Sequence, residues 1–203
     1  MLERYLIEQC APTLASLKTA ALFRCPLIQG VNLNEEIASM NHLMRDKGLR
    51  LTLLLVKKNW ALVYVYRPKR LYMDLNQDEV RILLEKYGYC TRENADVSQN
   101  SAIQMPENKT IDPEQAISDL MERLQESEQF PHEIGVFLGY PYADVIGFIR
   151  NHGENCICLG DWKVYDNAEE AVRLFDKYKK CRCIYTRLWS EGSRNLLELT
   201  VAA

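Results

Sequence analysis

The chain has 203 residues, of which 47% are hydrophobic and 26% charged, and its formal net charge is −3. This balance is typical of a globular protein and excludes a disordered chain, which needs low hydrophobicity and high net charge. The weak acidity provides no field that draws the protein to nucleic acid, so we expect no such partner. The longest apolar run, near Leu51–Val56, is far shorter than the roughly 20 residues of a membrane span. We therefore expect no membrane association and, because the N-terminus lacks signal-peptide features, a cytoplasmic protein.

The N-terminal region predicts short elements separated by proline and glycine. A helix is expected over residues 2–9, ending before Pro12, and a short strand around Ala20–Phe23. Asn34 is placed to cap a second helix over residues 35–46, since asparagine side chains accept hydrogen bonds from the first free helix amides.

The clearest local pattern is a β-hairpin. Leu49–Val56 and Trp60–Tyr66 are rich in strand-forming residues and are separated by the polar connector Lys57–Asn59. Apolar side chains alternate onto both faces, which predicts a ribbon covered on both sides. A third strand is expected at Leu71–Leu75.

A polar stretch divides the chain. Gln77–Tyr87 predicts a helix, and the residues 91–110 that follow are mostly polar. The segment 91–110 is therefore the expected linker or loop between an N-terminal α+β part, 1–90, and a C-terminal part, 111–203. The two parts are also compatible with one domain.

The C-terminal part is predicted to be mostly helical, so the fold class is α+β, with an antiparallel ribbon or small sheet flanked by helices and a more helical C-terminal part. Helix-starting signals precede apolar residues at helical spacing. A strand-like stretch lies between the last two helices. The expected helices begin at Asp112-Pro113, Phe130-Pro131, Pro141 and Asn167, and the strand-like stretch is Cys156–Tyr165.

Four segments resemble those of a known family. They are Cys10–Lys18, Leu62–Arg67, Phe130–Pro141 and Trp162–Tyr165. Together they are similar to an uncharacterised bacterial family labelled domain of unknown function 3793, over nearly the whole chain, and Phe130–Pro141 is the most specific segment. The resemblance implies a cytosolic protein of about this size and carries no activity, cofactor or catalytic residue.

The seven cysteines do not predict a metal site. Their number is odd, which favours free thiols in a reducing compartment. Cys156 and Cys158 are expected to share one face of a strand, whereas Cys181 and Cys183, two residues apart on a helix, diverge. Neither spacing is the two-to-four-residue interval usual for zinc cysteines.

Cys10, His132 and Glu133 are the candidate catalytic residues, as nucleophile, base and orienting group. Lys18 favours a Cys10 thiolate, while the end of the first helix opposes it. The helix expected to begin near Pro131 favours an ionised Glu133 and a neutral His132. The alternative is a buried structural thiol, a histidine that caps or packs, and a glutamate that satisfies helix amides.

Lys18, Arg67 and Tyr140 are the candidate ligand-binding residues. If the segments Cys10–Lys18 and Phe130–Pro141 converge with Arg67, they combine cations, a thiol, an imidazole and a carboxylate. The sequence thus favours a site for a small, possibly anionic ligand, and it leaves open the ligand, any cofactor, any reaction and the oligomeric state.

Two other functions fit the sequence. The long helix Asn167–Trp189 and the apolar tail Leu196–Val201 are compatible with an adaptor or regulatory protein that docks on a partner, although the tail is more readily an edge strand. Cys156 and Cys158, with a further thiol, are compatible with a redox or metal-handling protein.

Overall fold

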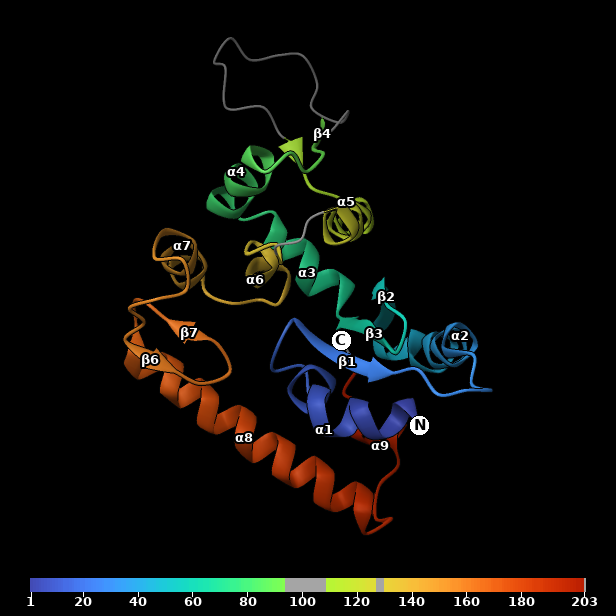
Figure 1. Ribbon diagram of the computed structural model, residues 1–203. Helices are drawn as coiled ribbons and strands as arrows, with labels where there is room; N and C mark the ends of the chain where they lie inside the picture. The colour runs from blue at the N-terminus through green and yellow to red at the C-terminus, as the bar shows by residue number, and fades with distance from the viewer. Residues whose placement is uncertain (94–108, 127–129, 203) are drawn as a thin grey trace, which may run out of the picture.

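The structure is a computed structural model that describes residues 1–93, 109–126 and 130–202 (Figure 1). It has an α+β fold in which helices surround a three-stranded antiparallel sheet, as the sequence predicts. Residues 94–108 of the predicted linker lie outside the described residues. No helix in the described ranges combines the length and apolarity that crossing a membrane requires.

The sheet contains β1 (Ala20–Pro26), β2 (Arg50–Val56) and β3 (Trp60–Tyr66) in the order β1-β3-β2. The β2–β3 hairpin is the one expected from the sequence. The third strand is β1, whose residues pair from Ala20 opposite Tyr66 to Pro26 opposite Trp60.

Leu71–Leu75, expected as a strand, belongs instead to helix α3 (Pro68–Leu75). Pro68 stands at the first helical turn, where its missing N–H costs nothing. Leu71 and Leu75 are buried while Tyr72 and Met73 are exposed. This spacing of four residues follows helical rather than strand periodicity.

The other N-terminal helices are α1 (Leu2–Leu14), α2 (Leu33–Met44) and α4 (Asp78–Lys86), with a short 3-10 turn, η1, at Arg45–Lys47. Helix α1 continues through Pro12 instead of ending before it. Asn32, rather than Asn34, caps α2 by accepting a hydrogen bond from the Asn34 amide.

The C-terminal part is mostly helical. Helix α8 is the longest, and it runs along the outer side of α1 (Figure 1). The strand-like stretch before it is a short ribbon, β6–β7. Two short strands, β4 (Arg92–Glu93) and β5 (Lys109–Thr110), precede this part. Its elements are α5 (Pro113–Glu126), α6 (Ile134–Phe137), α7 (Tyr142–Arg150), β6 (Cys158–Leu159), β7 (Lys163–Val164), α8 (Ala168–Ser190) and α9 (Leu196–Leu199).

The tail forms α9 rather than an edge strand. Asn195 and Glu198 make a reciprocal capping box, in which each side chain accepts from the other residue's backbone N–H. Two such bonds stabilise the first turn of a helix. Trp189, at the end of α8, donates its indole N–H to Glu3 Oε1 at 3.1 Å. The end of α8 is therefore fastened to α1 of the same chain.

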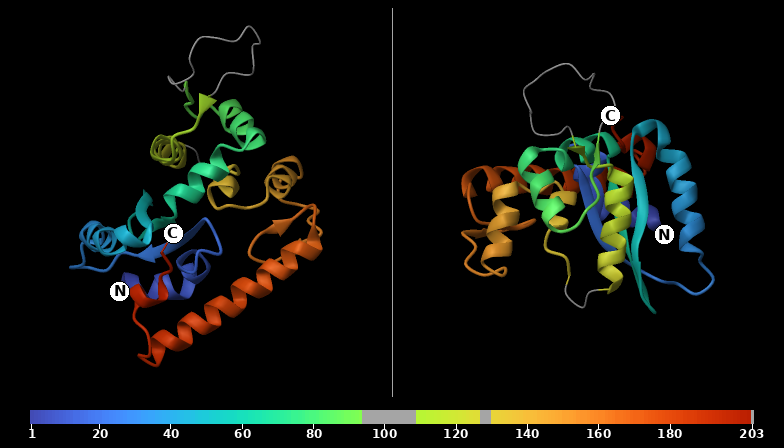
Figure 2. Two further views of the ribbon diagram at one scale, coloured as in Figure 1. Left: turned by 180° about the vertical axis from the view of Figure 1, so that it is seen from behind. Right: turned by 90° about the horizontal axis from the view of Figure 1, so that it is seen from above.

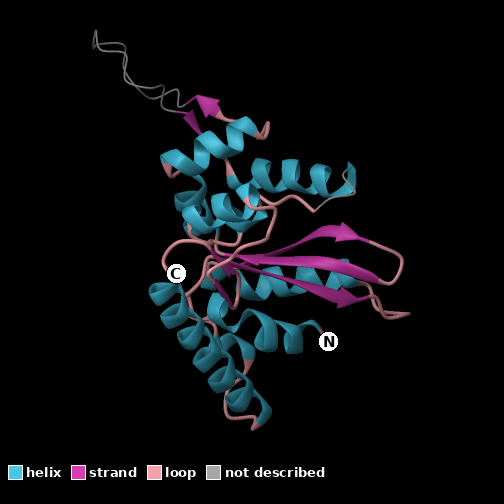
Figure 3. Ribbon diagram, turned by 60° about the vertical axis from the view of Figure 1, so that its left-hand side comes forward, coloured by secondary structure: helices cyan, strands magenta, loops and turns pink. Residues whose placement is uncertain are grey.

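Both faces of the sheet are covered, as Figures 2 and 3 show. Alternation along β3 sends Val63 and Val65 to one core and Leu62 and Tyr64 to the other. The first core is completed by α1, α2 and α9, and the second by α3, α4, α5, α6 and α7. The second core thus draws residues from both sides of the segment 94–108, and the proposed division into two parts stays a prediction.

Candidate functional site

A pocket of about 190 Å³ lies beside α6, α7 and β7. These three elements are neighbours in Figure 1. Most of the lining is apolar or aromatic, and it also contains His132, Asp144 and Lys163. We call this the aromatic pocket; its lining residues are Phe130, Pro131, His132, Ile134, Gly135, Tyr140, Asp144, Val145, Phe148, Trp162 and Lys163.

Glycines allow α6 and α7 to fold closely together. A Cβ on Gly135 would lie 2.7 Å from Cγ2 of Val145. A larger residue at this position would therefore prevent the two helices from packing as closely as they do. Gly139 has φ of +68°, and a Cβ there would meet the Thr19 side chain at 2.8 Å. Left-handed backbone of this kind strongly favours glycine.

Asp144 fastens the β6–β7 ribbon to α7. Its Oδ2 accepts the indole N–H of Trp162 at 2.7 Å, and its Oδ1 accepts the backbone N–H groups of Tyr165 and Asp166 at 2.7 and 3.1 Å. Only 4% of Asp144 is exposed. Three donors therefore compensate a buried carboxylate, and Trp162 is held in place as a wall of the pocket.

Aromatic rings extend from the pocket toward α8. Tyr140 stacks on Trp162 with centroids 5.0 Å apart, and Trp162 meets Phe175 of α8 edge-on at 4.6 Å. On the other side, the ring of His132 contacts Phe148 edge-on at 5.1 Å. Such contacts fix ring orientations and give the pocket rigid walls.

Two lysines lie at this site. Lys163 Nζ donates to the Gly153 carbonyl at 2.7 Å and forms no ion pair with a carboxylate in the described parts of the chain. Lys18 Nζ lies 4.8 Å from the centroid of the Tyr140 ring. Burial lowers the pKa of Lys18 to about 8, with Asp161 opposing the shift. Asp161 is already bound by both terminal nitrogens of Arg182, at 2.7 and 3.2 Å.

Three of the predicted site residues meet here. His132 and Tyr140 line the aromatic pocket, and Lys18 lies over the Tyr140 ring. The segment Phe130–Pro141 supplies one side of the pocket, and Phe148 and Trp162 on the other side were not among the predicted site residues. The one local signal for Trp162 is a tryptophan next to a lysine in a segment that resembles the family.

Cys10 does not reach this site. Its side chain is 0% exposed and packs in the core between α1 and the sheet. Burial raises the pKa of the Cys10 thiol, and the nearby Lys18 opposes this only in part. His132 lies in the aromatic pocket, so the structure does not bring the predicted nucleophile and base together.

Arg67 is a structural residue here. It is fully buried, and its Nε donates to the Thr13 carbonyl at 2.8 Å. Its two terminal nitrogens donate to the carbonyls of Lys47 at 3.2 Å, Leu14 at 2.8 Å and Val201 at 2.9 Å. The guanidinium therefore directs four hydrogen bonds to backbone carbonyls of the fold.

Glu133 is also committed within the fold. Only 1% of the residue is exposed, and its Oε1 accepts from Arg123 Nε at 2.7 Å and from the Tyr89 hydroxyl at 3.2 Å. It therefore joins α5 to the start of α6 rather than orienting His132. The catalytic set predicted from the sequence is not assembled as a unit.

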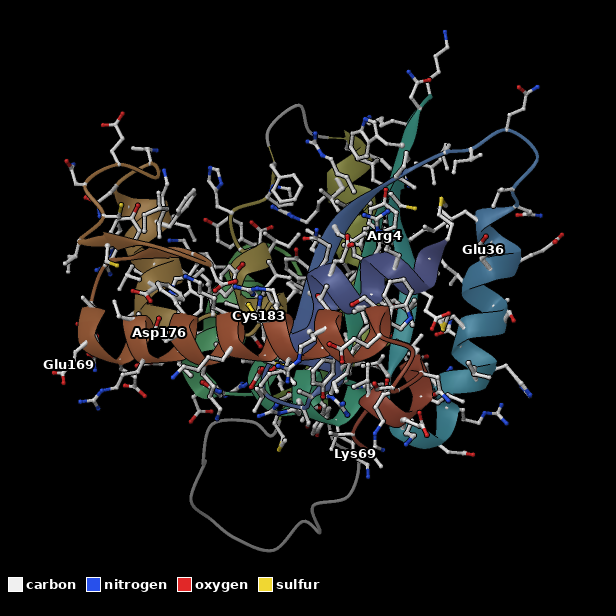
Figure 4. All side chains as sticks on the ribbon, turned by 90° about the horizontal axis from the view of Figure 1, so that it is seen from below. Arg4, Glu36, Lys69, Glu169, Asp176 and Cys183 are labelled. Carbon is white, nitrogen blue, oxygen red and sulfur yellow. The ribbon has the colours of Figure 1, made fainter. Side chains whose placement is uncertain are left out.

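The cysteines are unbridged thiols. Cys156 and Cys158 are half-buried, Cys181 is buried, and Cys183 is exposed on α8 (Figure 4). Among the described residues, no group of three or more histidine, cysteine, aspartate or glutamate side chains is arranged to hold a metal ion.

The fold and site define an α+β protein whose helical part carries an aromatic pocket with a lysine at its edge. The chain belongs to the family described as Protein of unknown function (DUF3793), which matches residues 6–200. Comparisons with curated proteins and with solved structures give no match.

Proposed function

We propose that this protein binds a small aromatic anion in the aromatic pocket. The size of the cavity supports a single ring with a short substituent. A cavity of about 150 Å³ lined by apolar side chains holds benzene, and this pocket has about 190 Å³. Typical pockets for drug-sized ligands begin near 300 Å³, so a larger ligand is not favoured.

The lining supports an aromatic ligand. Rings of Tyr140, Phe148 and Trp162 face the cavity from different elements, and Phe130 stands at its edge with 45% of its surface exposed. Offset or edge-on stacking on such rings stabilises a planar ligand beyond the burial of its apolar surface.

The observation that supports a negatively charged ligand is the position of Lys163. It lines a mostly apolar and aromatic pocket together with His132 and Asp144, and its ammonium uses one donor on Gly153 and has no carboxylate partner in the described ranges. An ammonium has three donors. A carboxylate on the ligand would complete this charge in a partly desolvated place, where the attraction is stronger than in water.

The test uses benzoate as probe and benzamide as its neutral counterpart. Binding is followed by NMR through the indole N–H of Trp162 and the methyl groups of Ile134 and Val145. Benzoate is expected to shift these signals and to bind about tenfold more tightly than benzamide, since a charged hydrogen bond contributes about 1.5 kcal/mol or more.

Two variants separate the ring site from the charge site. Phe130→Ala is expected to weaken both probes, whereas Lys163→Met is expected to weaken benzoate and leave benzamide unchanged. The matched control is Tyr72→Ala, because Tyr72 has the same 45% exposure on α3 and does not line the pocket. Benzoate affinity that both pocket variants leave unchanged would contradict the proposal.

A further inference from the structure

A second hollow lies at the edge of the sheet formed by β2, opposite the edge formed by β1, and residues of β2 make its floor. It has a volume of about 800 Å³, and helices α2 and α5 form its walls. The right-hand view of Figure 2 shows β2 running between these two helices. We call it the edge groove; its lining residues are Asn34, Ile37, Ala38, Asn41, Leu51–Lys57, Met121 and Gln125.

The floor of the edge groove is a sheet edge, because the strand order β1-β3-β2 leaves β2 paired on one side only. At Leu51 the edge is closed: the Asn41 side chain accepts from the Leu51 N–H at 2.8 Å and donates to its C=O at 2.9 Å. The next outward-facing residue of an antiparallel strand is two positions on, at Leu53. No corresponding side chain among the described residues closes the edge there.

Beyond Leu53 the register shifts by a bulge, and Leu55 pairs with Leu62 and Val56 with Ala61. The Lys57 N–H donates to the Trp60 carbonyl at 2.9 Å, so Lys57 faces β3. By alternation the backbone N–H and C=O of Val56 face outward, as those of Leu53 do. The edge therefore offers two sets of backbone donors and acceptors along the floor of the groove.

The walls offer both apolar and amide side chains to an added strand. On α2, Ile37 and Ala38 lie beside Asn34 and Asn41, and on α5, Met121 lies beside Gln125. Both helices pack against β2. An added strand would place successive side chains alternately toward each helix.

The ends of β2 are positively charged. Arg50 begins the strand, Lys57 and Lys58 follow it, and all three side chains are exposed. None forms an ion pair with a carboxylate in the described parts of the chain. Acidic residues at the ends of an added strand would meet these cations.

We propose that the edge groove binds an extended segment of a partner protein, which adds beside β2 as a fourth strand, with apolar or β-branched residues in its middle and acidic residues at its ends. Main-chain hydrogen bonds supply affinity in such strand addition, and pockets for alternate side chains supply specificity. A second copy of this chain fits less well. Antiparallel pairing of β2 with itself about Leu53 brings Arg50 of one copy to the same end of the joined sheet as Lys57 and Lys58 of the other, so each end would gather cations without an acidic partner.

The probe is a blocked, fluorescent peptide as long as β2, which has seven residues. It alternates valine and threonine and carries aspartate at both ends. By fluorescence anisotropy it is expected to bind about tenfold more tightly than the same peptide with lysine at both ends, because like charges oppose docking. Methylation of alternate peptide nitrogens is expected to abolish binding, since it removes the main-chain donors.

Variants of the full chain locate the binding. Ala38→Trp fills the groove and is expected to abolish binding, whereas Ser39→Trp, at the next exposed position of α2 outside the lining, leaves it unchanged. Arg50→Glu is expected to weaken the preference for the aspartate-ended peptide, because only the cations Lys57 and Lys58 at the other end of β2 remain. In the bound state, hydrogen exchange at the amides of Leu53 and Val56 is expected to slow.

Several outcomes would overturn the proposal. They are absence of binding at millimolar peptide, binding that Ala38→Trp leaves intact, or exchange at Leu53 and Val56 that the peptide does not slow. Sedimentation that shows a dimer abolished by Ala38→Trp would assign the edge groove to a second copy instead and would equally overturn it. None of these outcomes involves the aromatic pocket.

Discussion

Arg67 and Lys18 were both expected to hold an anion, and the structure treats them differently. The guanidinium of Arg67 is fully buried and donates to four backbone carbonyls. The ammonium of Lys18 is partly buried over the Tyr140 ring and has no hydrogen-bond acceptor among the described residues. One cation holds the fold together, and the other carries a charge that the fold does not fully compensate.

This contrast shows how the form of a cation decides its role. A guanidinium presents five donors in a planar fork and can connect several chain segments, whereas an ammonium is a compact point charge whose pKa shifts readily on burial. A buried cation is therefore structural when backbone carbonyls accept from its N–H donors. It is a better candidate for binding a ligand when its donors have no acceptor within the protein.

The largest effect is expected at Arg67. Arg67→Met removes four hydrogen bonds to backbone carbonyls, two of them buried and two part-buried, and we expect the free energy of unfolding to fall by about 4 kcal/mol, at roughly 1 kcal/mol per bond. Urea denaturation measures it. Lys69→Met is the matched control, because Lys69 is exposed two residues away (Figure 4). A loss no larger than that of the control would mean that the four bonds contribute nothing net.

Asp144 tests the attachment of the ribbon. Asp144→Asn puts an amide NH₂ where a carboxylate oxygen accepts from Trp162 or from the backbone of Tyr165. We expect a loss of about 2 kcal/mol, in the range for hydrogen bonds to charged groups, together with a shifted Trp162 indole signal. Asp166→Asn, at a nearby exposed position, serves as control, and equal losses in the two variants would contradict the anchoring role.

Lys18 is expected to lower stability at neutral pH. Because burial lowers its pKa from 10.5 to about 8, the unfolded chain keeps a proton between these pH values that the folded protein has released. The contribution of Lys18 to stability therefore rises with pH across this window, and below it the folded protein bears the full cost of the buried charge.

The measurement compares Lys18→Met with the unaltered protein by denaturation from pH 7 to 10. We expect the variant to be more stable at pH 7 by about 1 kcal/mol, a value discounted because the side chain is partly exposed. The advantage should vanish near pH 10. Taking the difference removes the titration of tyrosines and cysteines common to both proteins, and a constant difference would contradict the lowered pKa.

The smallest effect is expected at His132. The residue is exposed and its ring contacts Phe148, so His132→Ala should change stability by no more than about 0.5 kcal/mol. Its neighbour Glu133 is 1% exposed and bound to Arg123 and Tyr89, so Glu133→Ala should cost about 3 kcal/mol. Similar losses at the two positions would contradict the different roles that we assign to them.

Local patterns predicted much of the fold. The β2–β3 hairpin has continuous β-rich runs and a polar turn, and α8 has a long apolar stripe after Asn167, which caps it in the structure. The third strand was assigned wrongly because Pro68 starts a helix in which Leu71 and Leu75 are buried at a spacing of four residues. The tail was also assigned wrongly, although Asn195 and Glu198 have the spacing of a capping box.

The candidate site was less predictable, because burial depends on tertiary contacts. Nothing near Cys10 in the sequence shows that the thiol is sealed against the sheet, and nothing near Arg67 shows that Val201 supplies one of its acceptors. The segment Phe130–Pro141 was identified as a candidate from its resemblance to the family. Its connection to Trp162 runs through Asp144, 18 residues away, and was not visible locally.

The reach of Arg67 bears on how the protein folds as it is synthesised. Its bond to Val201 joins residues 134 positions apart. At about 5 to 20 residues per second, the ribosome needs roughly 7 to 27 seconds to add that much chain. Throughout that interval the arginine is present and its last acceptor is not. The first core, to which Leu196 and Leu199 of α9 contribute, can therefore be completed only after nearly the whole chain has been made.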